Sequence, residues 1–164
     1  MSLDLERRFP GVRFYNPVLV EVQENVEIGA GTRIGAFTLI HAGARIGKDC
    51  TIGSHCNIHQ ATIGDRVSIQ TACHITRGVT IEDDVFVGPG VITLNDKFMS
   101  GELSFLRICN SARIGGGSVI LPGTVVGASA VVGAGSLVNR DVPAAVVVVG
   151  NPARERAVGS AHRD

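Results

Sequence analysis

Branched apolar residues return along this chain at every sixth position. The series starts at Val22, slips by one residue between Ile58 and Ile63, and breaks between Thr93 and Ile108. Eighteen of its nineteen members are valine or isoleucine, and glycine directly follows nine of them. The nineteen positions are Val22, Ile28, Ile34, Ile40, Ile46, Ile52, Ile58, Ile63, Ile69, Ile75, Ile81, Val87, Thr93, Ile108, Ile114, Ile120, Val126, Val132 and Val138.

A period of six with one large apolar residue predicts one short strand and one turn per repeat. Three such units close a triangular coil of about 18 residues, and the coils stack through parallel strand pairing. The series therefore predicts an all-β parallel β-helix of about six coils, a single domain over residues 1–156. The break predicts a loop, residues 94–107, that leaves one corner, and residues 157–164 are expected to form a disordered tail.

Charge balance and cysteine usage narrow the choice of partners. The 164 residues include 15 Lys plus Arg and 15 Asp plus Glu, a zero net charge that argues against nucleic-acid or anionic-membrane binding. No apolar run is long enough to cross a membrane, and the first residues lack the apolar core of a signal peptide. The four cysteines have no CxxC spacing, so we expect reduced thiols and a cytoplasmic protein.

The repeat resembles that of the hexapeptide-repeat acyltransferases over roughly residues 16–155. This resemblance implies a left-handed β-helix, whereas the general rule for parallel crossovers favours the right-handed form. The segments Asp141-Val142-Pro143 and Val149-Gly150-Asn151-Pro152-Ala153-Arg154 look like the ending of sugar and antibiotic acetyltransferases. The resemblance thus implies acetyl-CoA as acyl donor and a homotrimer with its sites between neighbouring subunits.

Sorting the turns by every third repeat gives three columns, one for each corner of the prism. The first column is rich in glycine in its three upper turns, which either allows tight turning or exposes backbone amides to the pantetheine arm of coenzyme A. The cofactor candidates in these turns are Gly116, Gly117 and Ala134. Arg140 and Arg154 are candidates for the coenzyme phosphates, or else ordinary surface arginines. The second column has the character of a solvated edge, and we assign it no chemistry.

Three irregularities meet in the third column. His41 and His59 are 18 residues apart, so their side chains should stack on adjacent coils. The one-residue slip follows His59 directly, and the 94–107 loop leaves the same corner two coils above. Because loops on a rigid scaffold commonly carry function, we place the site at this corner.

The residues at this corner resemble those of N-acetyltransferases that act on nucleotide-linked amino sugars. The stretches Ala-Gly-Ala-Arg-Ile-Gly and Val-Phe-Val-Gly-Pro-Gly carry the likeness, which places Asn95 near the sugar amine. A related group acting on bacterial amino sugars has its general base four residues before the isoleucine of Ile-Gly-Asp, the position of His59. The predicted site residues are His59 and Asn95 in catalysis and His41, Asp96 and Lys97 in substrate binding.

Three classes of function fit these observations. The first is an acetyl-CoA-dependent N-acetyltransferase acting on a nucleotide-linked amino sugar for surface polysaccharide synthesis. The second is an O-acetyltransferase acting on a sugar or another small hydroxylated acceptor. The third is a non-catalytic scaffold or a metal-dependent anhydratase. His41, His55, His59 and His74 do not fit the paired-histidine spacing of that anhydratase, so no metal is expected.

Overall fold

All nineteen predicted repeats are strands in the computed structural model, which describes residues 2–156. The predicted residue is the second of each strand and points into the prism, where all but the partly buried Ile28 are buried. The strands are β2 (Glu21–Val22), β3 (Glu27–Ile28), β4 (Arg33–Ile34), β5 (Leu39–Ile40), β6 (Arg45–Ile46), β7 (Thr51–Ile52), β8 (Asn57–Ile58), β9 (Thr62–Ile63), β10 (Ser68–Ile69), β11 (His74–Ile75), β12 (Thr80–Ile81), β13 (Phe86–Val87), β14 (Ile92–Thr93), β15 (Arg107–Ile108), β16 (Arg113–Ile114), β17 (Val119–Ile120), β18 (Val125–Val126), β19 (Val131–Val132) and β20 (Leu137–Val138).

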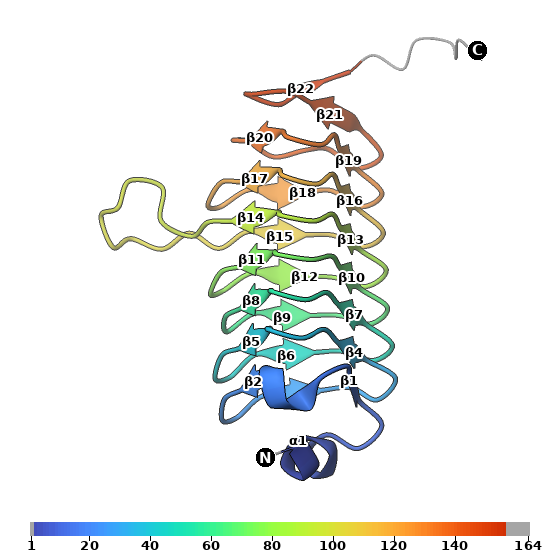
Figure 1. Cartoon of the computed structure of the whole chain (residues 1–164). Coiled ribbons are helices and arrows are strands. Elements are labelled where there is room, and N and C mark those ends of the chain that lie inside the picture. Colours follow the sequence, from blue (N-terminus) through green and yellow to red (C-terminus); the bar gives the residue numbers. More distant parts are fainter. Residues whose placement is uncertain (1, 157–164) are drawn as a thin grey trace, which may run out of the picture.

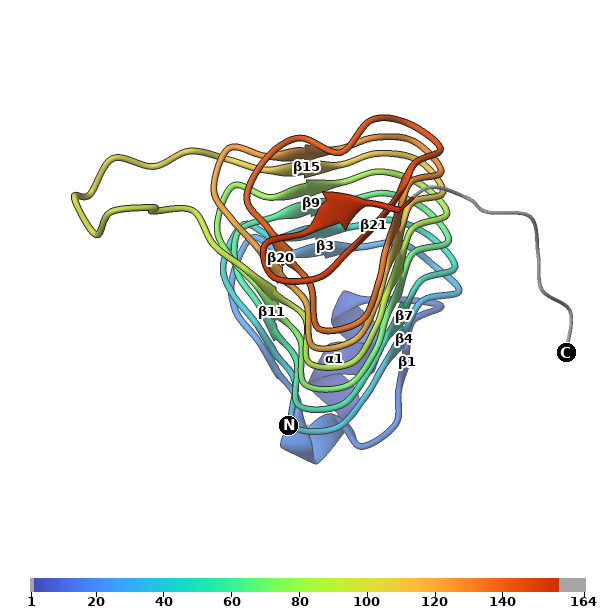
Figure 2. The ribbon, with the colours of Figure 1, turned by 90° about the horizontal axis from the view of Figure 1, so that it is seen from above.

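Three parallel sheets form the faces of a triangular prism (Figure 1). Sheet A holds β1, β4, β7, β10, β13, β16, β19, β21 and β22, sheet B runs from β2 to β20, and sheet C from β3 to β18. Seen from above, the chain passes from sheet A through sheet B to sheet C in the clockwise sense as it rises (Figure 2). The β-helix is therefore left-handed, as the resemblance implied. We name the corners A–B, B–C and C–A after the sheets they join.

The number of coils is larger than predicted. Sheet A stacks eight parallel strands, against about six predicted levels, because β1 (Arg13–Phe14) and β21 (Val147–Val149) extend it at its two ends. Phe14 lies eight residues before Val22, and Val148 lies ten residues after Val138, so neither follows the period of six. Both side chains are nevertheless buried and complete the core at either end.

The interior is aliphatic, with hydroxyl groups at the corners. Ile34 and Ile52 pair across β4 and β7 and are almost fully buried, and each such side chain contributes about 1.5–3 kcal/mol of transfer free energy. The buried Thr38 hydroxyl donates a hydrogen bond of 2.9 Å to the carbonyl oxygen of Gly53. The buried Thr32 and Ser118 hydroxyls likewise donate to the backbone of a neighbouring coil, whereas that of Thr124 donates to Leu121 in its own turn.

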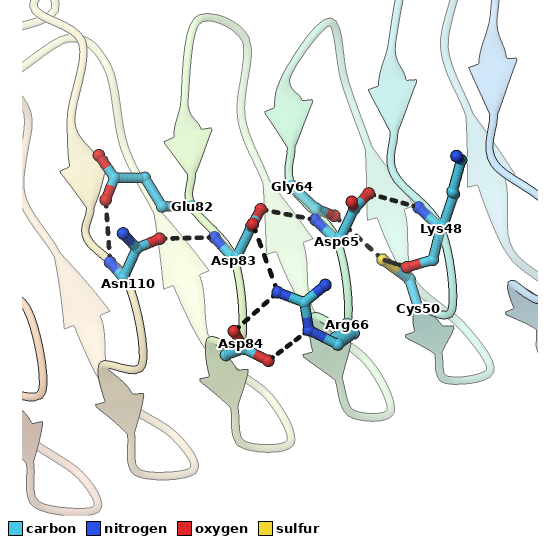
Figure 3. A network of polar contacts seen from close by, with 9 residues as sticks. All are labelled: Lys48, Cys50, Gly64, Asp65, Arg66, Glu82, Asp83, Asp84 and Asn110. Atoms are coloured by element: carbon cyan, nitrogen blue, oxygen red, sulfur yellow. Dashed lines mark hydrogen bonds and ion pairs between the residues drawn. The ribbon is translucent and has the colours of Figure 1, made fainter.

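The C–A corner is a ladder of side chains bonded to backbone rather than a merely solvated edge (Figure 3). An Asp65 carboxylate oxygen accepts the Lys48 backbone N–H at 2.8 Å, and an Asp83 oxygen accepts the Asp65 N–H at 2.8 Å. One rung higher, the Asn110 amide oxygen accepts the Asp83 N–H at 3.0 Å. Four consecutive turns of this corner are therefore tied together by side chains, which gives this column a structural role.

Different elements close the two ends of the prism. Helix α1 (Ser2–Arg8) lies at the N-terminal end, where Leu5 and Phe9 are buried, and a short 3-10 helix, η1 (Pro17–Leu19), precedes β2. At the other end β22 (Arg154–Glu155) turns back antiparallel to β21. No helix of the described residues is long and apolar enough to span a membrane. The predicted tail, residues 157–164, lies outside the described residues.

Candidate functional site

Three imidazole rings gather where sheet B meets the B–C corner. The rings of His41 and His59 are stacked, with centroids 4.0 Å apart and planes 8° from parallel, as their spacing predicted. The ring of His74 lies against that of His59, with centroids 5.0 Å apart and an interplanar angle of 60°. The corner chosen from the sequence thus contains a histidine cluster.

The sheet ladder fixes the backbone of this cluster. The N–H of His41 donates to the carbonyl oxygen of Ile58 at 2.8 Å, and that of His59 donates to Ile75 at 2.9 Å. The His41 Nε2 atom lies 2.8 Å from the amide oxygen of Asn57, the outward residue of β8. Because an amide oxygen only accepts, Nε2 of His41 carries the proton in this hydrogen bond.

Burial and neighbouring charge both act on His59. Burial lowers its pKa below the ordinary value of 6.5, and repulsion from protonated His41 and His74 lowers it further. The pKa of His74 is lowered as well, by burial and by His41. A lowered pKa leaves the His59 imidazole neutral at pH 7, the state in which it can accept a proton.

The predicted loop projects far from the B–C corner and covers residues 94–106, because Arg107 already belongs to β15 (Figures 1 and 2). The Asn95 side-chain amide donates to the carbonyl oxygen of Arg77 at 3.1 Å, and the Ser104 N–H donates to the Asn95 carbonyl at 2.8 Å. Asn95 is therefore held at the root of the loop, between the prism and the returning limb.

Asp96 and Lys97 lie on the outgoing limb of the loop. The Asp96 carboxylate accepts backbone N–H groups of Phe98 (3.1 Å), Ser100 (3.1 Å) and Gly101 (2.7 Å), and these bonds, that from Gly101 first, lower its pKa. The Lys97 ammonium lies 5.5 Å from the centre of the Phe98 ring. Asp96 thus shapes the loop, and a substrate contact for either residue stays a prediction.

The glycine-rich edge is the A–B corner, and its glycines differ in their surroundings. A Cβ on Gly116 would lie 3.0 Å from the Pro89 carbonyl oxygen, which fits the tight-turn explanation. Gly117 has a φ of 69°, but a Cβ there would meet nothing within 4 Å. Ala134 is exposed in the next turn up. An added Cβ would thus be crowded at Gly116 and free at Gly117, and a coenzyme contact at Gly116, Gly117 or Ala134 stays a prediction.

The two candidate arginines lie together at the C-terminal end of the prism. Arg140 and Arg154 line a cavity of about 220 Å³ at the C-terminal end, with Asp141 and Glu155 also on its wall. Arg140 follows β20 of sheet B and so belongs to the B–C side of the prism. The predicted cofactor residues therefore form two groups. Gly116, Gly117 and Ala134 lie in turns of the A–B corner, and Arg140 and Arg154 line the cavity at the C-terminal end.

Two stretches of the chain match known sequence families. Residues 25–60 match the bacterial transferase hexapeptide family, described by six repeats, and residues 107–140 match the hexapeptide repeat of succinyl-transferase. Both matched families are hexapeptide repeats of transferases, the same kind of repeat from which this prism is built.

Several solved structures share the fold of this chain. A Bacillus cereus protein, whose acetyltransferase assignment is itself inferred, is 26% identical with a TM-score of 0.70, over 88% of this chain and 81% of its own. The acetyltransferase domain of PglB from Neisseria gonorrhoeae, in complex with acetyl coenzyme A, is 21% identical with a TM-score of 0.62. The match covers 94% of this chain and 67% of the PglB chain. A mutant of the Caulobacter crescentus GDP-perosamine N-acetyltransferase, in complex with CoA and GDP-perosamine, is 23% identical with a TM-score of 0.52. The match covers 85% of this chain and 57% of the Caulobacter chain. The chain thus spans little more than half of the Caulobacter protein.

The sequence did not single out two members of the histidine cluster. His74 and Asn57 are outward residues of β11 and β8 and are paired in register, 17 residues apart. The three sequence columns consist of the turn residues that follow each inward isoleucine. His74 and Asn57 each precede an inward isoleucine and therefore belong to no column. Among residues 2–156, no group of three or more His, Cys, Asp or Glu side chains could hold a metal ion.

Proposed function

We propose that this protein transfers the acetyl group of acetyl-CoA to an amino group of a nucleotide-linked sugar, in the synthesis of a surface polysaccharide. The observation that carries the proposal is the position of His59. A half-buried imidazole with a lowered pKa lies at the corner from which the loop emerges, with Asn95 at the loop's root. A base and an acceptor-positioning amide are what amide formation from a thioester requires.

The chemistry assigns one role to each residue. A sugar amine must attack the thioester carbonyl in its unprotonated form, and the new C–N bond forms as the C–S bond breaks. The His59 imidazole takes the proton that the amine loses and returns it to the departing thiolate. Asn95 orients the acceptor, and a backbone N–H of a corner turn stabilises the oxyanion.

Relatives of this fold support the choice of substrates. The Caulobacter protein was solved with CoA and GDP-perosamine, and the PglB domain with acetyl coenzyme A. A prism of this kind can therefore present an acyl donor and a nucleotide-linked amino sugar together. All four cysteine thiols are free, which suits our proposal of a cytoplasmic enzyme. We also propose that it works as a homotrimer with sites between subunits.

The test is thiol release from acetyl-CoA across nucleotide-linked 3-amino and 4-amino sugars, with hydroxylated sugars beside them. We expect release with one or a few amino sugars, a large loss in His59→Ala, and unchanged rates in His55→Ala. His55 is a matched control because it is an exposed histidine at the A–B corner, stacked on Phe37. Release only with hydroxylated acceptors would favour an O-acetyltransferase, and no release with any acceptor would contradict the proposal.

A further inference from the structure

A groove of about 630 Å³ lies on sheet C, beside the B–C corner. We propose that it holds the nucleoside diphosphate part of the acceptor, an inference that rests on the proposed function. Its volume lies within the range of small-molecule sites. The lining residues are Asn25, Glu27, Gly43, Arg45, Gln60, Ala61, Thr62, Arg77, Gly78 and Phe105.

The floor of the groove is a row of outward residues on neighbouring strands. Arg45 of β6 is paired in register with Glu27 of β3 on one side and with Thr62 of β9 on the other. The Arg45–Glu27 ion pair is 3.5 Å long, with 66% and 71% of the two side chains exposed. An exposed pair of this kind is weak, so the Arg45 guanidinium can exchange Glu27 for a phosphate.

Arg77 provides a second guanidinium and connects the groove to the loop. Among residues 2–156 no carboxylate lies within salt-bridge distance of Arg77, and its side chain is exposed. Its backbone carbonyl accepts the Asn95 side-chain amide at 3.1 Å. A phosphate bound by Arg77 would therefore lie close to the residue that we expect to position the sugar.

Phe105 supplies an aromatic surface at the same place. A Cβ on Gly78 would lie 2.1 Å from the Phe105 ring, so the ring packs directly on the glycine backbone. The side chain is still 54% exposed. A half-exposed ring beside two guanidiniums fits a planar base attached to a diphosphate, because bases stack on aromatic rings and arginine binds phosphate oxygens in pairs.

Coenzyme A also contains a nucleoside diphosphate, and the position of the groove argues against it as the occupant. The groove adjoins the loop root, where the acceptor is expected. Arg140 and Arg154, the candidates for the coenzyme phosphates, line a separate cavity at the C-terminal end. We therefore assign the groove to the acceptor.

The test is calorimetric titration of the whole protein with UDP, GDP, dTDP, inorganic pyrophosphate and coenzyme A. We expect at least one nucleoside diphosphate to bind, and more tightly than pyrophosphate, which has no base to stack. Arg77→Gln should weaken that binding about tenfold or more. Phe105→Leu should weaken it less, and neither change should alter coenzyme A binding. Arg113→Gln, a change at an exposed arginine on sheet A, is the control and should bind as the wild type.

Three results would overturn the proposal: no binding of any nucleoside diphosphate, equal binding by Arg77→Gln, or a loss confined to coenzyme A. The titrations involve no acetyl transfer, so they can succeed even if the proposed function fails. Conversely, the protein could acetylate an amino sugar with the same KM in Arg77→Gln as in the wild type. That result would support the proposed function and contradict the assignment of the groove to the acceptor.

Discussion

At the scale of single residues, the environment of His59 decides its chemistry. Two imidazoles lie within 5.0 Å of its ring centre, and both burial and their charge disfavour its protonated form. A base that stays neutral below its ordinary pKa remains active in mildly acidic solution.

The pH dependence of acetyl transfer should reflect this lowered pKa. With the acceptor concentration expressed as unprotonated amine, we expect kcat/KM to be constant near pH 7 and to fall only below pH 6.5, as His59 becomes protonated. His74→Asn removes a neighbouring positive charge and part of the burial, so the acid limb should move to higher pH. The check is a pH–rate series on both proteins and on His55→Asn, which should match the wild type. An acid limb centred above 6.5 in the wild type would contradict the assignment.

Gly78 is the residue on which the returning limb of the loop rests. It has a φ of 84°, and a Cβ there would lie 2.1 Å from the Phe105 ring. Gly78→Ala should therefore lower the free energy of unfolding by about 2–4 kcal/mol, from backbone strain plus displacement of the ring. Urea unfolding would measure this loss.

Gly90→Ala is the matched control for that change. Gly90 has a φ of 66° with nothing within 4 Å of its Cβ position, so only strain, about 1 kcal/mol, should be lost. Equal losses in the two variants would show that Phe105 does not press on Gly78.

Residue patterns predicted inward positions well and side-chain partners poorly. Even Thr93, the exception in the apolar series, is buried as predicted, and its hydroxyl oxygen accepts the Thr76 N–H at 2.9 Å. Strand alternation fixes the direction of each Cβ, which explains this success. The bonds of Asp96 depend on the path of an irregular loop, which no repeat specifies.

At the scale of elements, the turns are held by two devices: side-chain rungs at the C–A corner and glycines at the A–B corner. Both were visible as columns in the sequence. The rungs of the C–A corner were not foreseen, because Asp in a turn can bond to its own backbone as readily as to that of the next coil.

A rung can be removed without changing the shape of the turn. Asp65→Ala leaves the Lys48 N–H without its acceptor and should lower the free energy of unfolding by about 1 kcal/mol. Asp65→Asn keeps an amide oxygen in place, as Asn110 does two rungs higher, and should cost less than half as much. Chemical denaturation of the pair measures the difference. Equal losses would mean that the charge, rather than the hydrogen bond, matters.

The loop is joined to the prism at a narrow neck. The hydrogen bond from Ser104 N–H to the Asn95 carbonyl holds its two limbs together, as in the last pair of a hairpin. Replacing residues 96–103 by two glycines should therefore leave the circular dichroism and melting temperature unchanged. Acceptor-dependent turnover should fall about a hundredfold or more because the acceptor is no longer oriented. Full turnover in this variant would show that the loop is not part of the acceptor site.

At the scale of the whole molecule, every coil contacts only its neighbours above and below. The period of six therefore predicted the prism, its three faces and the corner of the loop. It undercounted the coils because β1 and β21 meet the end caps, where the spacing that a regular coil requires no longer applies. The histidine cluster was half predicted, since it combines two corner residues, His41 and His59, with two strand residues of the adjoining face, Asn57 and His74.

Assembly is the property of the whole molecule that the proposed function requires. We expect light scattering to give about three times the chain mass of 17.1 kDa, because the proposed sites lie between subunits. Catalysis by a protein that remains a monomer at working concentration would contradict that arrangement.

The unlike ends of the prism have a consequence for how far the structure can grow. A β-solenoid with a bare terminal coil exposes unpaired backbone groups, and a second molecule could dock there and continue the stack. Here β22 runs antiparallel along β21 at one end and α1 lies at the other. Within residues 2–156, sheet A therefore ends in an antiparallel strand and the first coil lies beside a helix, and both features disfavour end-to-end stacking of molecules into a filament.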